Sequence, residues 1–420
     1  MAALDAFGRL RVAGCFTTFN YYPSLMTNNT SLDVDVWVSG QTGGTQTYEP
    51  QNYINMPISG TGTTYSLRTT KQPMIYQPGK SRLIYMTGVL MTATGAGTDS
   101  YMGLFSVDTN TPPGITEGTY LRCDGTNLIF EDVTQSGTTT VVQSSWNIDT
   151  FNGNGPSGKT LTIANAAQTL LLVMDQEWLG VGRIRCGFII DGVIYYGHQF
   201  LHNGLIVQYT KTPRIYLSYY IKGTVANAMR QMCSTSIIED GYFSTGRINN
   251  ILVPVSDPTS FVAVGNNNND IVLLGLRVQT GFPLSTFFLK NLSFYYFGTG
   301  GGSGKYAQFK IHMFSTNGSI GELSDTPTPP TPPTLTFIPL INSSIEYYIG
   351  NGTIYTSAAN PGFIIGSGYL DTQTSFEFVS VVNDSLQTRN LFTKYDTLFV
   401  TGVANSAGTM GTSVSFIEDI

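Results

Sequence analysis

Apolar and polar residues alternate along much of this chain with the period of two that a half-buried β-strand imposes. Within residues 181–190, positions 184, 186, 188 and 190 are apolar, whereas positions 183, 185 and 187 hold two arginines and a glycine. Residues 82–90 form a compact apolar run instead. The first pattern predicts a strand with one buried face, and the second predicts a core strand.

Turn signals separate the expected strands. An Asp-Gly dipeptide at 191–192 directly follows the alternating segment and precedes the apolar residues 193–196. Both central residues of a two-residue hairpin turn need positive φ, which Asp-Gly and Asn-Gly tolerate. The same device recurs as Asp-Gly at 124–125 and Asn-Gly at 351–352. We expect antiparallel hairpins at all three places.

Helical periodicity is scarce. Residues 164–168 could form one helical turn, and residues 225–233 favour a helix, but the flanking segments 215–221 and 234–238 read as strand. Forty-six glycines and 19 prolines punctuate short strands along the whole chain. This pattern predicts an all-β fold of two antiparallel, jelly-roll-like β-sandwich domains.

Polar segments mark the expected domain boundaries. A polar region at 240–269 ends in four asparagines at 266–269, so we expect one sandwich over residues 1–245 and a second over 246–420. Residues 326–333 (TPTPPTPP) form an extended, semi-rigid segment. It could link two domains, but a surface loop within the second sandwich is the favoured interpretation.

The strands expected around the proline-rich segment together suffice for one sandwich. They are residues 287–297, 307–314, 335–340, 376–382, 397–403 and 413–417.

Composition adds a hint about assembly. The 420 residues are 41% hydrophobic but only 11% charged, whereas ordinary soluble domains are about 25% charged. Uncharged polar residues can be buried against a neighbour without the desolvation penalty of a charge. The composition therefore favours a subunit that hides much of its surface in an assembly, although a Thr/Asn-rich surface on a free protein remains the alternative.

Several classes of protein are disfavoured. The net charge is −6 with no basic run, so we expect no direct contact with nucleic acid. The apolar stretches are short and interrupted, which argues against a membrane span, and the first residues do not read as a secretory signal. Four scattered cysteines, Cys15, Cys123, Cys186 and Cys233, lack zinc spacing and are expected to be reduced and buried.

Four ordered motifs carry a resemblance. They are residues 5–12 (DAFGRLRV), 76–81 (YQPGKS), 143–147 (QSSWN) and 176–188 (QEWLGVGRIRCGF). With them, the chain resembles a group of virion structural proteins of tailed phages and large DNA viruses. The likeness covers roughly the first 245 residues and continues beyond them only in pattern, for instance at 366–369 (GSGY), and the proline-rich segment departs from it.

The resemblance implies a component of a virus particle without saying which component. The motifs also have plain structural interpretations, because Pro78-Gly79 is a turn signal and the glycines within 178–187 let a strand bend. We expect residues 1–12 to act as an arm that docks on its own or on a neighbouring subunit.

One acidic pair invites a catalytic interpretation. Asp175 and Glu177 lie two apart on an expected strand, on one face and roughly 6.6 Å apart. Paired carboxylates serve glycoside hydrolysis, and Trp178 could stack on a sugar. Since nothing nearby is predicted to shift the pKa of either acid, we expect solvated carboxylates on a strand face and no catalytic residues.

The three histidines give little sign of a metal site. His198 and His202 have a spacing that suits a metal on a helix. On the strand expected here they would lie about 13 Å apart, too far to share an ion. His312 stands alone in an expected strand, where we give it a structural role.

Two further motifs have weak functional meaning. Residues 298–305 (GTGGGSGK) depart from a phosphate-binding loop, because Thr299 occupies the first glycine position and Tyr306 follows the lysine. We expect a loop between strands there. Glycosylation sequons at Asn28, Asn291 and Asn351 are expected to be coincidental.

These observations favour a non-enzymatic virion component, in the capsid, at a vertex or associated with the tail, that assembles in the host cytoplasm. It would act through self-association and packing on neighbouring virion proteins, and no catalytic, cofactor or metal residues are assigned. The alternative is a receptor- or glycan-binding fibre or spike protein, with residues 266–269 and 298–304 as candidate binding tips.

Overall fold

The computed structural model divides the chain into two compact units, the first containing the described residues up to Glu239 and the second those from Arg247 onward. Each unit is described by itself. The described residues are 15–23, 32, 36–74, 76–239, 247–253, 262–264, 270–279, 281, 285–298, 305–315, 336–350, 363–371, 375–379, 391–392, 396–405 and 407–419.

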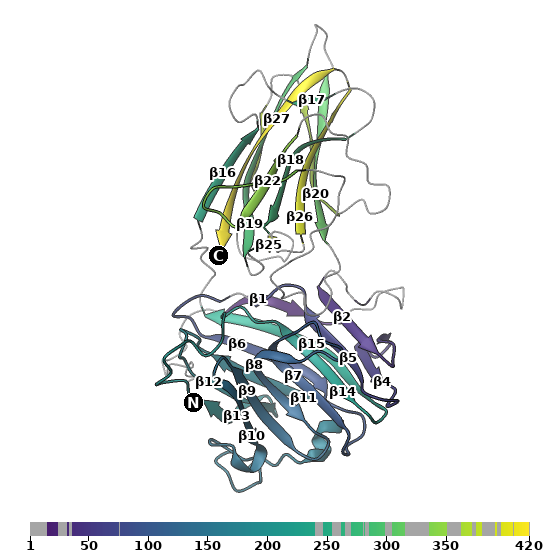
Figure 1. Ribbon diagram of the computed structural model, residues 1–420, viewed down its shortest axis with the longest axis vertical. Helices are drawn as coiled ribbons and strands as arrows, with labels where there is room; N and C mark the ends of the chain where they lie inside the picture. Colours follow the sequence, from purple (N-terminus) through teal and green to yellow (C-terminus); the bar gives the residue numbers. More distant parts are fainter. Residues whose placement is uncertain are drawn as a thin grey trace. The chain divides into compact units, whose positions relative to one another are not determined.

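The first unit is a sandwich of two antiparallel sheets (Figure 1). Sheet 1 runs in the order β13 (Val193–Phe200), β12 (Ile184–Ile190), β11 (Leu170–Gln176), β6 (Arg82–Val89), β15 (Asn227–Glu239), β4 (Tyr53–Ile58) and β3 (Thr47–Glu49), with β1 (Cys15–Tyr21) also paired to β15. Sheet 2 runs in the order β10 (Gly137–Val142), β9 (Leu128–Thr134), β8 (Ile115–Cys123), β7 (Thr98–Val107), β14 (Leu217–Gly223), β5 (Thr64–Thr70) and β2 (Trp37–Thr42).

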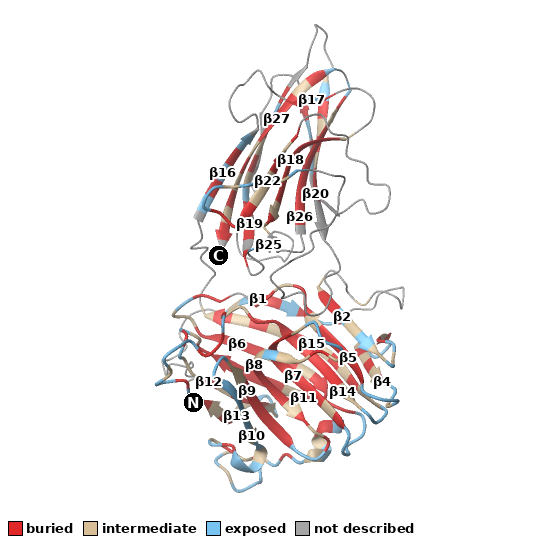
Figure 2. Cartoon of the chain, viewed as in Figure 1, coloured by how far each residue is buried: buried red, intermediate tan, exposed pale blue. Residues whose placement is uncertain are grey.

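The core of this sandwich comes from alternate residues of both sheets. β6, the apolar run of the sequence, lies inside sheet 1 between β11 and β15 and buries Ile84 and Met86. On β12, Ile184, Cys186 and Phe188 are buried, as their period of two predicts. Figure 2 shows buried residues concentrated in the strands of this unit and exposed residues mostly in its loops.

The expected two-residue turn is confirmed at one hairpin, whereas a second hairpin has a longer turn. Asp191 and Gly192 have φ of 53° and 77° and join β12 to β13 by the expected two-residue turn. Between β8 and β9 the connection has four residues instead of two, and only Gly125 has positive φ. The carboxylate of Asp124 accepts the backbone N–H groups of Thr126 and Asn127, which stabilises the longer turn.

The few helical turns are short. Two 3-10 helices occur in the described residues, η1 (Gln143–Ser145) and η2 (Ile163–Ala167), and η2 confirms the turn expected at 164–168. The helix-favouring segment 225–233 instead enters β15, where pairing with β4 and β6 overrides local propensity. No helix in the described ranges is long and apolar enough to cross a bilayer.

The cysteines depart in part from expectation. All four are free thiols, and Cys123 and Cys186 are buried. Cys15 and Cys233 are exposed, so the prediction that all four are buried is wrong for these two. Both lie on strands, where side chains alternate between the two faces of the sheet and every second one faces away from the core.

The second unit is also a sandwich of two antiparallel sheets. Its first sheet contains β16 (Arg247–Val253), β27 (Gly408–Asp419), β19 (Thr286–Gly298) and β24 (Ser375–Val379), with β17 (Val262–Val264) paired to β27 and β25 (Leu391–Phe392) paired to β19. The second contains β21 (Ile338–Pro339), β22 (Ile345–Ile349), β18 (Ile271–Val278), β26 (Asp396–Ala404), β20 (Tyr306–Ser315) and β23 (Phe363–Asp371).

The core of the second unit includes stacked rings of Phe294 and Phe309, whose centroids lie 3.9 Å apart. The predicted all-β fold with two antiparallel sandwiches is confirmed. The expected arm, the asparagines at 266–269, the glycine-rich residues 299–304, the proline-rich segment, the turn at 351–352 and the sequons at Asn28 and Asn351 lie outside the described residues.

Candidate functional site

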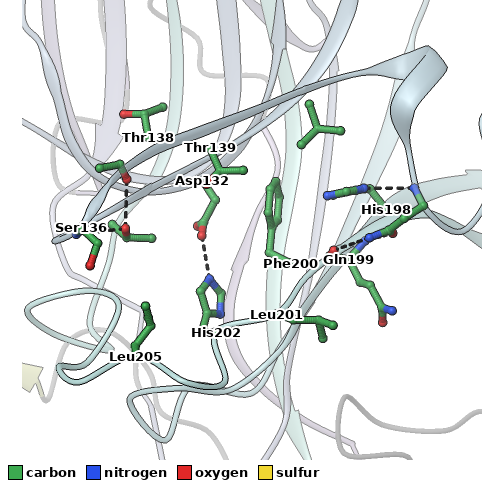
Figure 3. A pocket seen from close by; sticks show the side chains of 14 residues that line it. Asp132, Ser136, Thr138, Thr139, His198, Gln199, Phe200, Leu201, His202 and Leu205 are labelled. Atoms are coloured by element: carbon green, nitrogen blue, oxygen red, sulfur yellow. Dashed lines mark hydrogen bonds and ion pairs between the residues drawn. The ribbon is translucent and has the colours of Figure 1, made fainter.

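A pocket of about 470 Å³ opens between two edge strands of the first unit, β10 of sheet 2 and β13 of sheet 1 (Figure 3). Its walls hold four hydroxyl side chains, two amides, two imidazoles and one carboxylate. Four apolar side chains, among them Phe200 and Leu201, complete the lining. The site therefore combines many neutral hydrogen-bonding groups with a few apolar side chains.

The motif at residues 143–147 builds one side of this pocket. The indole ring of Trp146 packs in the core, 4.5 Å from the ring of Phe130 and 6.1 Å from that of Phe188. Directly after it, the amide of Asn147 pairs with the backbone of Gln199, accepting its N–H at 2.9 Å and donating to its carbonyl at 3.0 Å. The Asn147 side chain thus takes the place of a neighbouring strand along β13.

The same contact fixes the tautomer of His198. The backbone N–H of Asn147 donates to Nδ1 of His198 at 3.2 Å. Burial lowers the pKa of His198 to about 4, so the ring is neutral at neutral pH. A neutral ring with its lone pair on Nδ1 carries its proton on Nε2. His198 therefore contributes an N–H donor as a lining residue of the pocket.

His202 forms a different, fully engaged arrangement. Its Nε2 lies 2.7 Å from Oδ2 of Asp132, and its Nδ1 faces the carbonyl oxygen of Gly182. The imidazole also stacks on the ring of Tyr209, with centroids 3.9 Å apart. The other carboxylate oxygen of Asp132 accepts the hydroxyl of Thr119 at 2.6 Å. Both nitrogens of His202 face acceptors, so neither presents a lone pair to the pocket.

A row of buried, hydrogen-bonded side chains lies behind this wall of the pocket. The Tyr209 hydroxyl accepts from the amide of Gln176 at 2.8 Å, and Arg82 donates to the same amide and to the carbonyl of Met74. Arg82 is fully buried, and burial lowers its pKa to about 10. Tyr76 lies beside this row of side chains, where its hydroxyl accepts the N–H of Leu179. The motifs at 76–81 and 176–188 thus meet in one structural network.

The acidic pair of the sequence does not form a solvated strand face, so that expectation is wrong. Asp175 and Glu177 are both fully buried. Asp175 pairs with Arg185 and accepts hydroxyls from Ser81 at 2.7 Å and Tyr196 at 3.1 Å. Ser81, the last residue of the YQPGKS motif, therefore lies against this acid. The period-two pattern alone could not reveal that other side chains bury Asp175.

The assumed strand geometry of the histidines is also wrong. β13 ends at Phe200, so only His198 lies on the strand, and both imidazoles line the same pocket. Among the described residues, no group of three or more histidine, cysteine or acidic side chains is placed to hold a metal ion. His312 is buried, and its Nε2 lies 3.0 Å from the hydroxyl of Thr401, which fits the structural role assigned to it.

Sequence reasoning missed the pocket itself. The one local signal is the run Thr138-Thr139-Thr140, because adjacent β-branched hydroxyl residues favour a strand that exposes hydroxyls to a polar ligand. The other lining residues come from segments up to about 70 positions away, such as the Asp132–His202 pair. No local pattern links them.

Comparisons with known proteins give structural likenesses alone. No protein-family model matches the chain, and no curated protein matches it. Solved structures with a similar fold include a carbohydrate esterase from the Shiga toxin-encoding bacteriophage phi24B (11% identity, 54% of this chain, 100% of that one, TM-score 0.30). Others are a legume lectin-like domain from Entamoeba histolytica (8%, 48% and 90%, 0.29) and the Lotus tetragonolobus seed lectin (7%, 53% and 99%, 0.31). At these identities and scores, the likenesses do not say what this chain binds.

Proposed function

We propose that this chain is a virion protein whose first sandwich binds a glycan in the pocket between β10 and β13. The observation that carries the proposal is the lining of that pocket. Hydroxyls, amides and an imidazole N–H line it together with apolar side chains, of which Leu201 is 59% exposed. Neutral donors and acceptors match the hydroxyls of a sugar, and exposed apolar side chains match its apolar C–H face.

The size of the pocket supports a small ligand. A volume of about 470 Å³ lies within the range of about 300–1,000 Å³ typical of ligand pockets. The one carboxylate in the wall, Asp132, is already engaged by His202 and Thr119. The lining therefore favours a neutral sugar over a cationic ligand.

Binding suits this site better than catalysis. A general base needs a lone pair within reach of the substrate. The lone pair of neutral His198 accepts the N–H of Asn147, and both nitrogens of His202 face acceptors. Ser136 lines the same pocket, but a Ser-His-Asp arrangement would need a free nitrogen on His202.

The placement in a virion rests on the resemblance of the four sequence motifs and on the low charge content. A glycan site would let such a protein attach to a cell surface. The building-block role is the second candidate, and the specific observation that favours it is the uncovered edge of β10, discussed below.

A matched pair of substitutions tests the pocket. Thr139 lines it, whereas the adjacent Thr140 does not, and both side chains are exposed. Thr139→Trp should fill the pocket and abolish binding of the sugar selected on a glycan array, as measured by calorimetry with the monovalent sugar. Thr140→Trp should bind like the unchanged protein. Absence of any sugar ligand on a broad array, or equal binding by both variants, would refute the proposal.

A further inference from the structure

Strand β10 has an unusual composition for the edge of a sheet. Its six residues, GTTTVV, carry no charge, no proline and five β-branched side chains. Five of the six are exposed. Edge strands usually carry lysine, proline or a bulge, because their free backbone groups can pair with a strand of another chain. β10 has none of these protections.

The free side of β10 also lacks backbone partners within the described chain. Its ladder is to β9 alone, and the one bond from elsewhere to a β10 backbone group is from the indole N–H of Trp146 to the carbonyl of Val141, at 3.1 Å. An edge strand directs about half of its N–H and C=O groups away from its neighbour. These groups are available to a further strand.

The two end strands of sheet 1 are protected differently. At β13, the backbone N–H groups of Ile148 and Asp149 donate to the carbonyl of Gly197, and Asn147 pairs with Gln199. At the far end of sheet 1, β3 is three residues long and ends in Glu49. In contrast to these two edges, β10 has a free side along which no backbone of the described residues pairs.

Exposed apolar residues lie in the loop next to the turn that leads into β10. Ile206 is fully exposed, and Leu201 is 59% exposed. Gln135, in the turn before β10, donates through its backbone to Tyr209 and through its side chain to the carbonyl of Gln208. These bonds hold the loop that carries Ile206 next to the β9–β10 turn. Residues 200–210 contain no lysine, arginine or acid, and charge is typically depleted at the centre of an interface.

We propose that β10 pairs antiparallel with β10 of a second copy of this chain. A two-fold axis places a strand antiparallel to itself, so the two edges must be self-complementary. An edge without charges brings no like charges together, and pairs of β-branched residues across strands are favourable. A neutral edge also offers no charge pattern by which a different partner would be selected.

The pairing has a consequence for both sheets and pockets. The seven strands of sheet 2 in each copy join into one continuous sheet. Thr138 and Thr139 of β10 line the pocket, so each pocket lies beside the joint. The proposal concerns the edge alone and stands whether or not the pocket binds a sugar.

Sedimentation velocity over a range of concentrations tests the pairing with the full chain. The unchanged protein should form a dimer, and the double variant Thr140→Lys/Val142→Lys should raise the dissociation constant by about tenfold or more. The control, Val193→Lys/Val225→Lys, adds the same charge at exposed positions outside β10 and should leave the dimer intact. Hydrogen exchange should show amides of β10 that become protected as concentration rises.

Three outcomes would overturn the proposal. The first is a monomer at all concentrations. The second is a dimer that the β10 lysines do not weaken relative to the control lysines. The third is protection of the β10 amides that does not change with concentration, which would mean that a segment of the same chain covers the edge. A circular dichroism spectrum equal to that of the unchanged protein establishes that each variant is folded.

Discussion

The two long walls of the pocket are built in opposite ways. On one wall, Asp132 and His202 are buried and contact each other across 70 positions of the sequence, and Tyr209 stacks on His202 from behind. On the other, the residues of β10 project exposed hydroxyls and have few contacts beyond β9. Folding energy is thus concentrated in the first wall, while the second can change its side chains with little effect on the fold. The predictions below test that division.

The largest effect is expected at the buried pair. Asp132→Ala removes the carboxylate that faces Nε2 of His202 at 2.7 Å and leaves the imidazole buried without its acidic partner. Leaving a buried polar group without its hydrogen-bond partner typically costs about 1–3 kcal/mol. Urea unfolding of the first unit should reveal this loss.

A double variant controls for the size of the effect. Asp132→Ala/His202→Leu removes both partners, so its loss of stability should be smaller than the sum of the two single losses. Strict additivity would contradict the view that this wall is a coupled unit.

An effect of intermediate size on stability is expected when a change of pH protonates His198. Its pKa in the folded chain is lowered to about 4, below the usual value near 6.5. Between these values the unfolded chain binds more protons than the folded chain, so this group makes stability fall as pH falls from about 6.5 to 4. Above pH 6.5 it contributes no pH dependence.

His198→Gln isolates that contribution. Glutamine can still accept the N–H of Asn147 but does not titrate. The difference in unfolding free energy between this variant and the unchanged protein should vary with pH between about 4 and 6.5 and be flat above it. A difference that is flat throughout would show that His198 does not carry the effect.

The smallest effect is expected on the exposed wall. Thr138 lines the pocket from β10, and its side chain is exposed. Thr138→Ala should change the unfolding free energy by no more than about 0.5 kcal/mol. A loss comparable with that of Asp132→Ala would break the comparison between the two walls.

The sequence predicted strands of this sandwich but neither wall of the pocket. Period-two patterning and the Asp-Gly turn identified the strands and one hairpin, because these signals are local. The buried wall depends on contacts such as Arg82 with Gln176 and His202 with Gly182, which only tertiary folding brings together.

The same reason explains the error at Asp175. The sequence placed this acid on a strand face but could not reveal that Ser81, Arg185 and Tyr196 would surround it. Patterning predicts which side a residue faces, whereas burial of that side depends on what folds over it. For His202, the prediction failed because the strand ends two residues earlier, at Phe200.

The uncovered threonines of β10 also matter for how this protein can evolve. Side chains that carry little folding energy can be replaced by mutation without first acquiring compensating changes elsewhere. Substitutions at Thr138 or Thr139 would reshape the pocket while the buried network around Arg82 and Asp132 keeps the scaffold intact. Descendants of one ancestral chain could in this way diverge in the ligands they accept and still share one fold.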